Sequence, residues 1–303
     1  MSASATARED LNALAWSVWA ELGVSGWERH HRRWCVDPEA LVVFTVWLGD
    51  TDARLRDEAT DWCVRYGTWL SATRLANVMA GASKQTLDRF GEFAATVCEH
   101  SPQRWRGATK ARKYKPTGRS RLESFAAPSL VDMRLRALMG VGARAEVMRL
   151  LLSAPSVALP ASDLVDDAGF KKRNIADALE SLRWGGALAV ERKRNQLQYF
   201  LADAHAWRSV VGELPDVWPR WTSLLTVLAT LTDAQEKLED VPTKVRNVEL
   251  AKLVRAHAHA IERARLPAPP APSAEVSFAD AVSEWLGHVA RELARGRWPG
   301  RVE

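Results

Sequence analysis

Three consecutive cations open a predicted helix near the middle of the chain. The stretch GFKKRNIADALESLRWGG covers residues 169–186 and places Lys171, Lys172 and Arg173 where its helical pattern begins. The start of a helix carries a partial positive charge, and Ser, Thr, Asp or Asn usually caps it. Cations in place of a cap therefore indicate that an anion from outside the chain, such as a nucleic-acid phosphate, compensates them on binding.

Helical spacing divides this stretch into two faces. The apolar face, at positions i, i+3, i+4 and i+7, consists of Ile175, Ala178, Leu179 and Leu182. The opposite face consists of Lys172, Arg173, Ala176, Asp177 and Glu180. The pattern predicts a helix that is anchored to the core by the first set and presents the second set to a ligand.

A short hairpin is expected directly after this helix. Two apolar runs, ALAVER and LQYFLA, flank the polar turn KRNQ, a pattern typical of two antiparallel strands. The tip carries a continuous polar and cationic run of Arg192, Lys193, Arg194, Asn195 and Gln196. The alternative to ligand binding is a solvated turn whose charges keep an edge strand soluble.

The element order over residues 144–201 is helix, helix, turn, helix, hairpin. It is carried by SDLVDDAGFKKRNIADALESLRWGGAL and the hairpin VERKRNQLQYFL, with Gly169 in the turn and Phe170 filling the core beneath it. This region resembles the winged helix-turn-helix of MarR- and ArsR-like bacterial repressors. The flanking helices also look similar to a group of uncharacterised bacterial proteins that carry such a domain in mid-chain. The chain departs from the pattern at Lys171, where Ser or Thr commonly caps the third helix, a loss of about 1 kcal/mol.

The resemblance implies that the third helix enters the major groove of DNA. Arg173 would pair with guanine, Asn174 with adenine, and Ala176 would contact a thymine methyl group. Lys171 and Lys172 would contact phosphates, which fix the register without reading sequence. The expected DNA-binding residues of this helix are Lys171, Lys172, Arg173, Asn174, Ala176 and Asp177. The hairpin tip would reach the adjacent minor groove or backbone as a wing.

A second cationic element lies upstream, in residues 101–122. It contains eight Lys or Arg and no acid, so the net charge of +5 would be −3 without it. Prolines and glycines interrupt its helical spacing and predict a linker. We expect an arm that contacts the DNA backbone through Arg112, Lys113, Lys115, Arg119 and Arg121. The alternatives are a solvated linker and an arm that binds structured RNA.

Helical patterns on both sides predict a mainly α fold, with a helical N-terminal domain, a central winged helix-turn-helix with a small β-hairpin wing, and a helical C-terminal region. The expected segments are a Trp-rich domain (1–100), the basic linker (101–122), the winged-helix domain (123–204) and a region for dimerisation or effector binding (205–303). The helix order in 38–80 also permits a second, degenerate helix-turn-helix. Tryptophans that alternate with Leu, Val and Ala are expected in the core, namely Trp16, Trp19, Trp47, Trp62 and Trp69.

No pattern of an enzyme, a metal site or a cofactor site is found. Cys35, Cys63 and Cys98 are too scattered for a disulfide framework or a zinc site and are expected as reduced thiols. His257 and His259 are two residues apart and therefore face different sides of a helix. Acidic pairs such as Asp166–Asp167 fit solvated helix faces.

The chain shows neither a secretory leader pattern nor an apolar run approaching the ~20 residues of a membrane span. We therefore expect a cytoplasmic protein without a membrane partner. The patterns together predict a sequence-specific transcriptional regulator that binds double-stranded DNA. A homodimer is expected, because one winged helix reads only a short half-site. The alternative is a protein-interaction module, such as the antitoxin-like neutralising partner of a toxin or an enzyme, with the Trp-rich helices as the partner surface.

Overall fold

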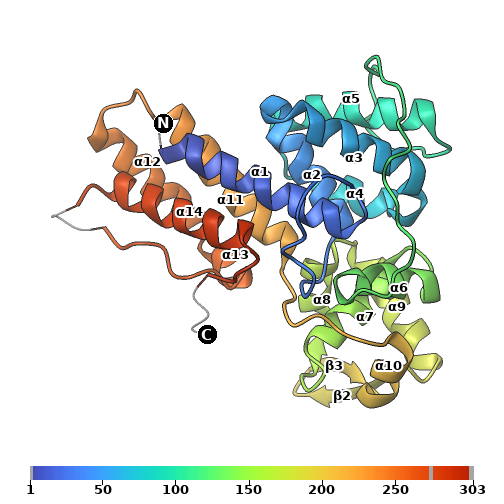
Figure 1. Ribbon diagram of the computed structural model, residues 1–303. Coiled ribbons are helices and arrows are strands. Elements are labelled where there is room, and N and C mark those ends of the chain that lie inside the picture. The colour runs from blue at the N-terminus through green and yellow to red at the C-terminus, as the bar shows by residue number, and fades with distance from the viewer. Residues whose placement is uncertain (1–2, 273–275, 300–303) are drawn as a thin grey trace.

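The chain folds into a mainly α-helical molecule with one small antiparallel sheet, which confirms the predicted fold class (Figure 1). The computed structural model describes residues 3–272 and 276–299. Two hydrophobic cores organise it, one in a larger helical part and one in a smaller part that holds the sheet.

Helices from both ends of the chain build the larger part, here named the helical body. Its helices are α1 (Ala3–Glu21), α2 (Pro38–Leu48), α3 (Ala53–Tyr66), α4 (Ala72–Met79), α5 (Lys84–His100), α11 (Trp221–Lys237), α12 (Thr243–Ala256), α13 (Ala258–Arg263) and α14 (Phe278–Ala294). α1 packs along α14, and both α1 and α2 contact α11 (Figure 1). The first and the last hundred residues therefore share one core. The division of the chain into the four expected segments stays a prediction.

Tryptophan side chains fill much of this core. Trp16, Trp19, Trp47 and Trp62 are buried, and Trp69 packs half-buried against them. The buried indoles also satisfy their polar atoms, since Nε1 of Trp19 donates to Thr45 Oγ1 at 2.8 Å and Nε1 of Trp62 donates to the carbonyl oxygen of Leu22 at 2.8 Å. The predicted core role of these tryptophans is confirmed.

The smaller part, here named the small lobe, follows the predicted element order. It consists of α6 (Val131–Met139), α7 (Ala143–Ser153), β1 (Leu159–Pro160), α8 (Ala161–Ala168), α9 (Lys172–Trp184), β2 (Leu188–Lys193), β3 (Gln196–Leu201) and α10 (Ala204–Val211). The sheet order is β1-β3-β2, all antiparallel, with Tyr199 opposite both Leu159 and Val190. The two-residue strand β1 was not expected from the sequence.

A buried network of charged side chains, here named the junction network, joins the lobe to the body. Its members are Arg74, Arg136, Arg149, Asp37, Glu39, Asp132 and Glu146, all buried. Both Arg74 and Arg136 bind Glu39 Oε2, at 2.8 and 2.7 Å, and Arg136 also lies 2.8 Å from Glu146 Oε1. Three guanidinium groups thus face four carboxyl groups. Burial raises the pKa of Asp132 to about 8, so this carboxyl holds the remaining proton at neutral pH.

Candidate nucleic-acid interface

The helix-turn-helix is formed by α8, a tight turn and α9. Gly169 ends α8 with a φ of +69°, a left-handed conformation that favours glycine. Phe170 is buried directly after it, as predicted. The predicted apolar face of α9 is also buried and packs against α7 and α8, because its four residues are at most 7% exposed. The local geometry therefore fixes which face of α9 meets solvent.

The N-terminus of α9 has no side-chain cap. Lys171 occupies the cap position with an extended backbone, and its side chain accepts no hydrogen bond from the first turn. Lys171, Lys172 and Arg173 are all exposed and make no ion pair within the described residues. The uncapped cationic start inferred from the sequence is thus present, and these charges are available to a ligand.

The remaining predicted residues of α9 divide between two sides of the helix. Asn174 and Asp177 line a groove of about 440 Å³ between α9 and the turn from α6 to α7, where the exposed Arg144 also lies. Ala176 is exposed but does not line that groove. A ligand that contacts Asn174 must therefore reach toward the α6–α7 turn.

The wing is a regular hairpin with a strained tip. β2 and β3 pair in register from Leu188–Leu201 to Lys193–Gln196, which leaves a two-residue turn of Arg194 and Asn195. Arg194 has a φ of +56°, where the first residue of such a turn is usually glycine. All five predicted wing residues, Arg192 to Gln196, are exposed, and the three cations among them make no ion pair in the described structure.

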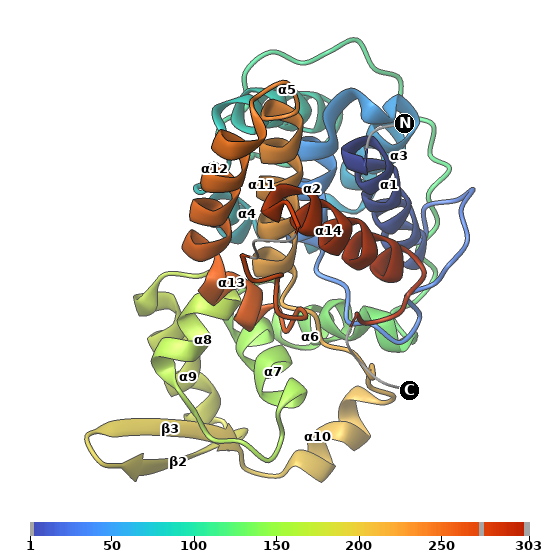
Figure 2. The ribbon, with the colours of Figure 1, turned by 90° about the vertical axis from the view of Figure 1, so that its left-hand side faces the viewer.

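The wing and α9 lie on the same flank of the lobe. Figure 2 shows the hairpin extending below α8 and α9, with its turn pointing to the same side of the molecule as these two helices. The six exposed cations, Lys171, Lys172, Arg173, Arg192, Lys193 and Arg194, therefore belong to two neighbouring elements. We name this set the α9–wing cations.

Helix α4 of the body packs onto the turn between α8 and α9. Asn77 Nδ2 donates to the carbonyl oxygen of Gly169 at 3.0 Å, and Arg74 Nε donates to that of Ala168 at 2.8 Å. α4 thus supports the first helix-turn-helix from the side, and its own Arg74 points into the core. A duplex that reaches α9 has to approach along the flank that α4 leaves open.

The basic segment lies on the helical body rather than beside the wing. Residues 101–127 run without regular structure over α3 and α5 (Figure 2). Arg112 Nη2 binds Asp57 Oδ1 at 2.6 Å, and the guanidinium group of Arg112 packs over the ring of Tyr114. Asp61 Oδ1 accepts the backbone N–H groups of Thr117 and Gly118 at 2.7 and 2.8 Å. The segment is therefore tied to α3 at several points.

The other cations predicted for the arm remain exposed. Lys113, Lys115, Arg119 and Arg121 make no ion pair among the described residues. The structure does not bring them together with α9 and the wing (Figure 2). Their contact with a nucleic-acid backbone stays a prediction.

One interpretation of acidic residues is wrong. Asp167 does not belong to a solvated helix face, because Arg263 binds its Oδ1 and Arg220 Nη1 lies 3.1 Å from its Oδ2. Its side chain is only 14% exposed. Asp166 Oδ2 also binds Arg263, at 3.0 Å. These partners lie 53 or more residues away in the sequence, so helical periodicity could not reveal them.

The described residues contain no group of three or more His, Cys, Asp and Glu side chains placed to hold a metal ion. Cys35, Cys63 and Cys98 are free thiols. No described helix has both the length and the apolarity to cross a bilayer.

No protein-family model matches the chain, and neither a curated protein nor a solved structure matches it.

Proposed function

We propose that the chain is a sequence-specific DNA-binding transcriptional regulator that acts as a homodimer through α9 and the wing. The observation that carries the proposal is the set of α9–wing cations, which are exposed and unpaired on two neighbouring elements. An anionic polymer is the natural partner of such a surface. The element order, the buried face of α9 and the wing support a groove-binding geometry.

Two features of α9 and the wing lower the stability of the free protein, and they also support DNA binding. The start of α9 lacks a cap and carries cations that the helix dipole repels, and the wing tip holds Arg194 in a conformation that suits glycine. Such departures from local stability cluster where a site has a function. Phosphates of a bound duplex would compensate both the dipole repulsion and the crowding of like charges.

The residues divide into two roles in this proposal. Arg173 reads a guanine through two hydrogen bonds, and Asn174 pairs with adenine where the duplex reaches the α6–α7 turn. Lys171, Lys172 and the wing cations contact phosphates or a narrow minor groove and set the register. Two copies of the chain would place two such units on successive half-sites.

Salt dependence of binding tests the proposal directly. The purified chain is titrated onto a fluorescent 30-base-pair duplex of random sequence at several salt concentrations. If the five α9–wing cations other than the base-reading Arg173 meet phosphates, log K falls with log salt at a slope of about −4.5 per protomer. The double variant Arg173→Ala/Arg194→Ala should lower this slope by about 1, through Arg194, while the protein stays folded.

Arg255→Gln is the matched control, because Arg255 is exposed on α12, a helix of the body. It should leave the slope unchanged. Affinity that does not vary with salt, or a double variant that binds like the control, would overturn the proposal. Absence of DNA binding at any salt, together with a stable complex with a protein partner, would favour the interaction-module alternative.

A further inference from the structure

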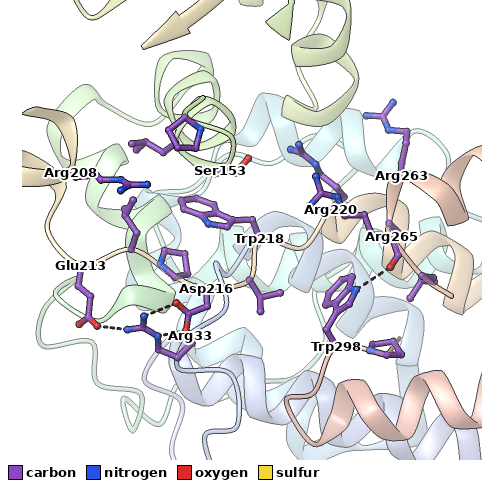
Figure 3. A pocket seen from close by; sticks show the side chains of 18 of the residues that line it. Arg33, Ser153, Arg208, Glu213, Asp216, Trp218, Arg220, Arg263, Arg265 and Trp298 are labelled. Atoms are coloured by element: carbon purple, nitrogen blue, oxygen red, sulfur yellow. Dashed lines mark hydrogen bonds and ion pairs between the residues drawn. The ribbon is translucent and has the colours of Figure 1, made fainter. Parts of the chain in front are cut away.

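A large cavity lies between the small lobe and the helical body. Its volume is about 890 Å³, within the range of sites for small organic ligands. The end of α7, helix α10 and the connection from Gly212 to Arg220 form one part of its wall, and residues after α13 and α14 form the other. Figure 3 shows Arg208 and Arg220 with the indole of Trp218 between them in this view.

Five arginines line this cavity, and they come from positions across the whole chain. They are Arg33, Arg208, Arg220, Arg263 and Arg265. Three are paired: Arg33 binds Glu213 and Asp216 (Figure 3), and Arg220 and Arg263 share Asp167. Arg208 and Arg265 make no ion pair among the described residues. Two guanidinium groups thus remain available on the cavity wall.

Arg265 is held in an unfavourable backbone conformation. Its φ is +54°, and apart from Arg194 at the wing tip it is the one non-glycine residue in the described ranges with a positive φ. A residue with a Cβ is disfavoured in this region. The carbonyl oxygen of Arg265 accepts a hydrogen bond from Trp298 Nε1 at 3.0 Å, which fixes the conformation. Strain retained at a charged residue on a cavity wall indicates a functional position.

The paired arginines also favour an additional anion. Burial lowers the pKa of Arg220, and the neighbouring Arg149, Arg265 and Arg263 lower it further. The pair with Asp167 opposes these effects but is shared with Arg263. An anion placed in the cavity would reduce the mutual repulsion of these guanidinium groups.

Flat aromatic surface accompanies the charge. Trp218 and Trp298 are both half-buried and line the cavity. Trp298 is braced by Trp34, with ring centroids 5.3 Å apart. An indole beside guanidinium groups offers stacking for a flat ring next to bidentate donors for an oxyanion.

We propose that this cavity binds a small organic phosphate that carries a flat ring. Arg265 takes the phosphate group beside Arg220 and Arg263, and an indole of the wall takes the ring. Arg208, on the other side of Trp218 in Figure 3, adds to the positive field. A phosphate dianion suits this wall better than a single carboxylate, because Arg265 has no carboxylate partner among the described residues and Arg220 shares its partner Asp167 with Arg263. The proposal does not depend on DNA binding.

Adenosine 5′-monophosphate is the probe, with adenosine, inorganic phosphate and benzoate as its partial analogues. Calorimetric titration of the full chain without DNA gives the affinities, and quenching of tryptophan fluorescence reports the ring contact. We expect a Kd for the monophosphate below about 1 mM and at least tenfold weaker binding of each analogue. The double variant Arg208→Gln/Arg265→Gln should bind the monophosphate at least tenfold more weakly.

A second variant separates binding from folding. Arg265→Gly removes the charge and the strain together, so it should unfold at higher denaturant concentration while it binds the monophosphate more weakly. The control Arg255→Gln should keep full affinity. A Kd for the monophosphate above about 1 mM would overturn the proposal. Equal affinity for phosphate, adenosine or benzoate would also overturn it, and so would undiminished affinity for the monophosphate in the double variant.

Discussion

Two sets of arginines in this molecule differ in burial and in ion pairing. In the junction network, Arg74 and Arg136 have side chains that are 1% exposed, and each lies against at least two carboxylates. In the α9–wing set, Arg173 and Arg194 are exposed, and no described carboxylate pairs with them. The first set satisfies its charge inside the chain, and the second leaves its charge for a ligand.

The difference shows how the same side chain supports structure in one place and binding in another. Removing water from a guanidinium group is costly, so a buried arginine persists only with carboxylates and good geometry around it. An exposed arginine keeps its hydration and contributes little to folding until an anion arrives. Substitutions should therefore separate the two sets by what they change: stability in the first, binding in the second.

The largest effect is expected at Arg136. Arg136→Met leaves Glu39 without two hydrogen bonds and Glu146 without one inside the core. The free energy of unfolding, measured in urea, should fall by about 3–5 kcal/mol. Arg173→Gln, the matched change in the exposed set, should alter it by less than about 0.5 kcal/mol. Equal effects at the two sites would remove the distinction between the sets.

The proton on Asp132 gives the junction network a characteristic pH dependence. The folded-state pKa is about 8 against 3.8 for the ordinary carboxyl, because burial penalises the charge. The carboxyl therefore contributes stability that is fully present below about pH 4 and is lost as the pH rises toward about 8. In Asp132→Asn the free energy of unfolding should lack this decline, so its excess over that of the wild type should grow as the pH rises from about 4 to about 8. Parallel pH profiles for the two proteins would show that Asp132 is ionised in the fold.

In the exposed set, Arg173 should matter most for binding. Loss of a bidentate base contact in Arg173→Ala should weaken binding to a selected operator by about 1–3 kcal/mol, roughly ten- to a hundredfold. Binding to unrelated duplexes should change far less, and fluorescence anisotropy with both duplexes measures the ratio. A uniform loss on every duplex would instead make Arg173 a phosphate contact.

Arg194 sharpens the comparison because its two effects should have opposite signs. Arg194→Gly relieves the positive φ at the wing tip, so unfolding should require up to about 1 kcal/mol more. The same change removes a cation from the wing, so the salt slope of DNA binding should fall by about 1. A protein that gains stability and keeps its full salt slope would argue against DNA contact by the wing.

The smallest effect is expected at Arg112, whose burial and ion pairing are intermediate between those of the two sets. It is paired with Asp57, but that carboxylate is 49% exposed. Arg112→Gln should therefore cost only about 0.2–1 kcal/mol in urea unfolding. A loss as large as that of Arg136→Met would place the basic segment among the structural elements of the fold.

The sequence predicted what local periodicity determines. The two faces of α9, the turn at Gly169 and the β2–β3 hairpin follow from repeats of 3.6 and 2 residues, so the exposed cations could be identified without coordinates. The buried charges could not, because Arg74 meets partners 37 and 94 residues away, at Asp37 and Ala168. The same reason explains the error at Asp167 and the absence of the arginine-lined cavity from the sequence-based expectations.

The most direct test of the account is selection of bound duplexes from a random DNA pool by the purified chain at moderate salt, in parallel with Arg173→Ala/Arg194→Ala. The account predicts a palindromic motif enriched by the wild type, with half-sites about one helical turn apart, and no enrichment by the double variant. If the folded wild type retains no duplex, or both proteins enrich the same motif, the α9–wing cations are not a DNA-reading surface and the central claim is wrong.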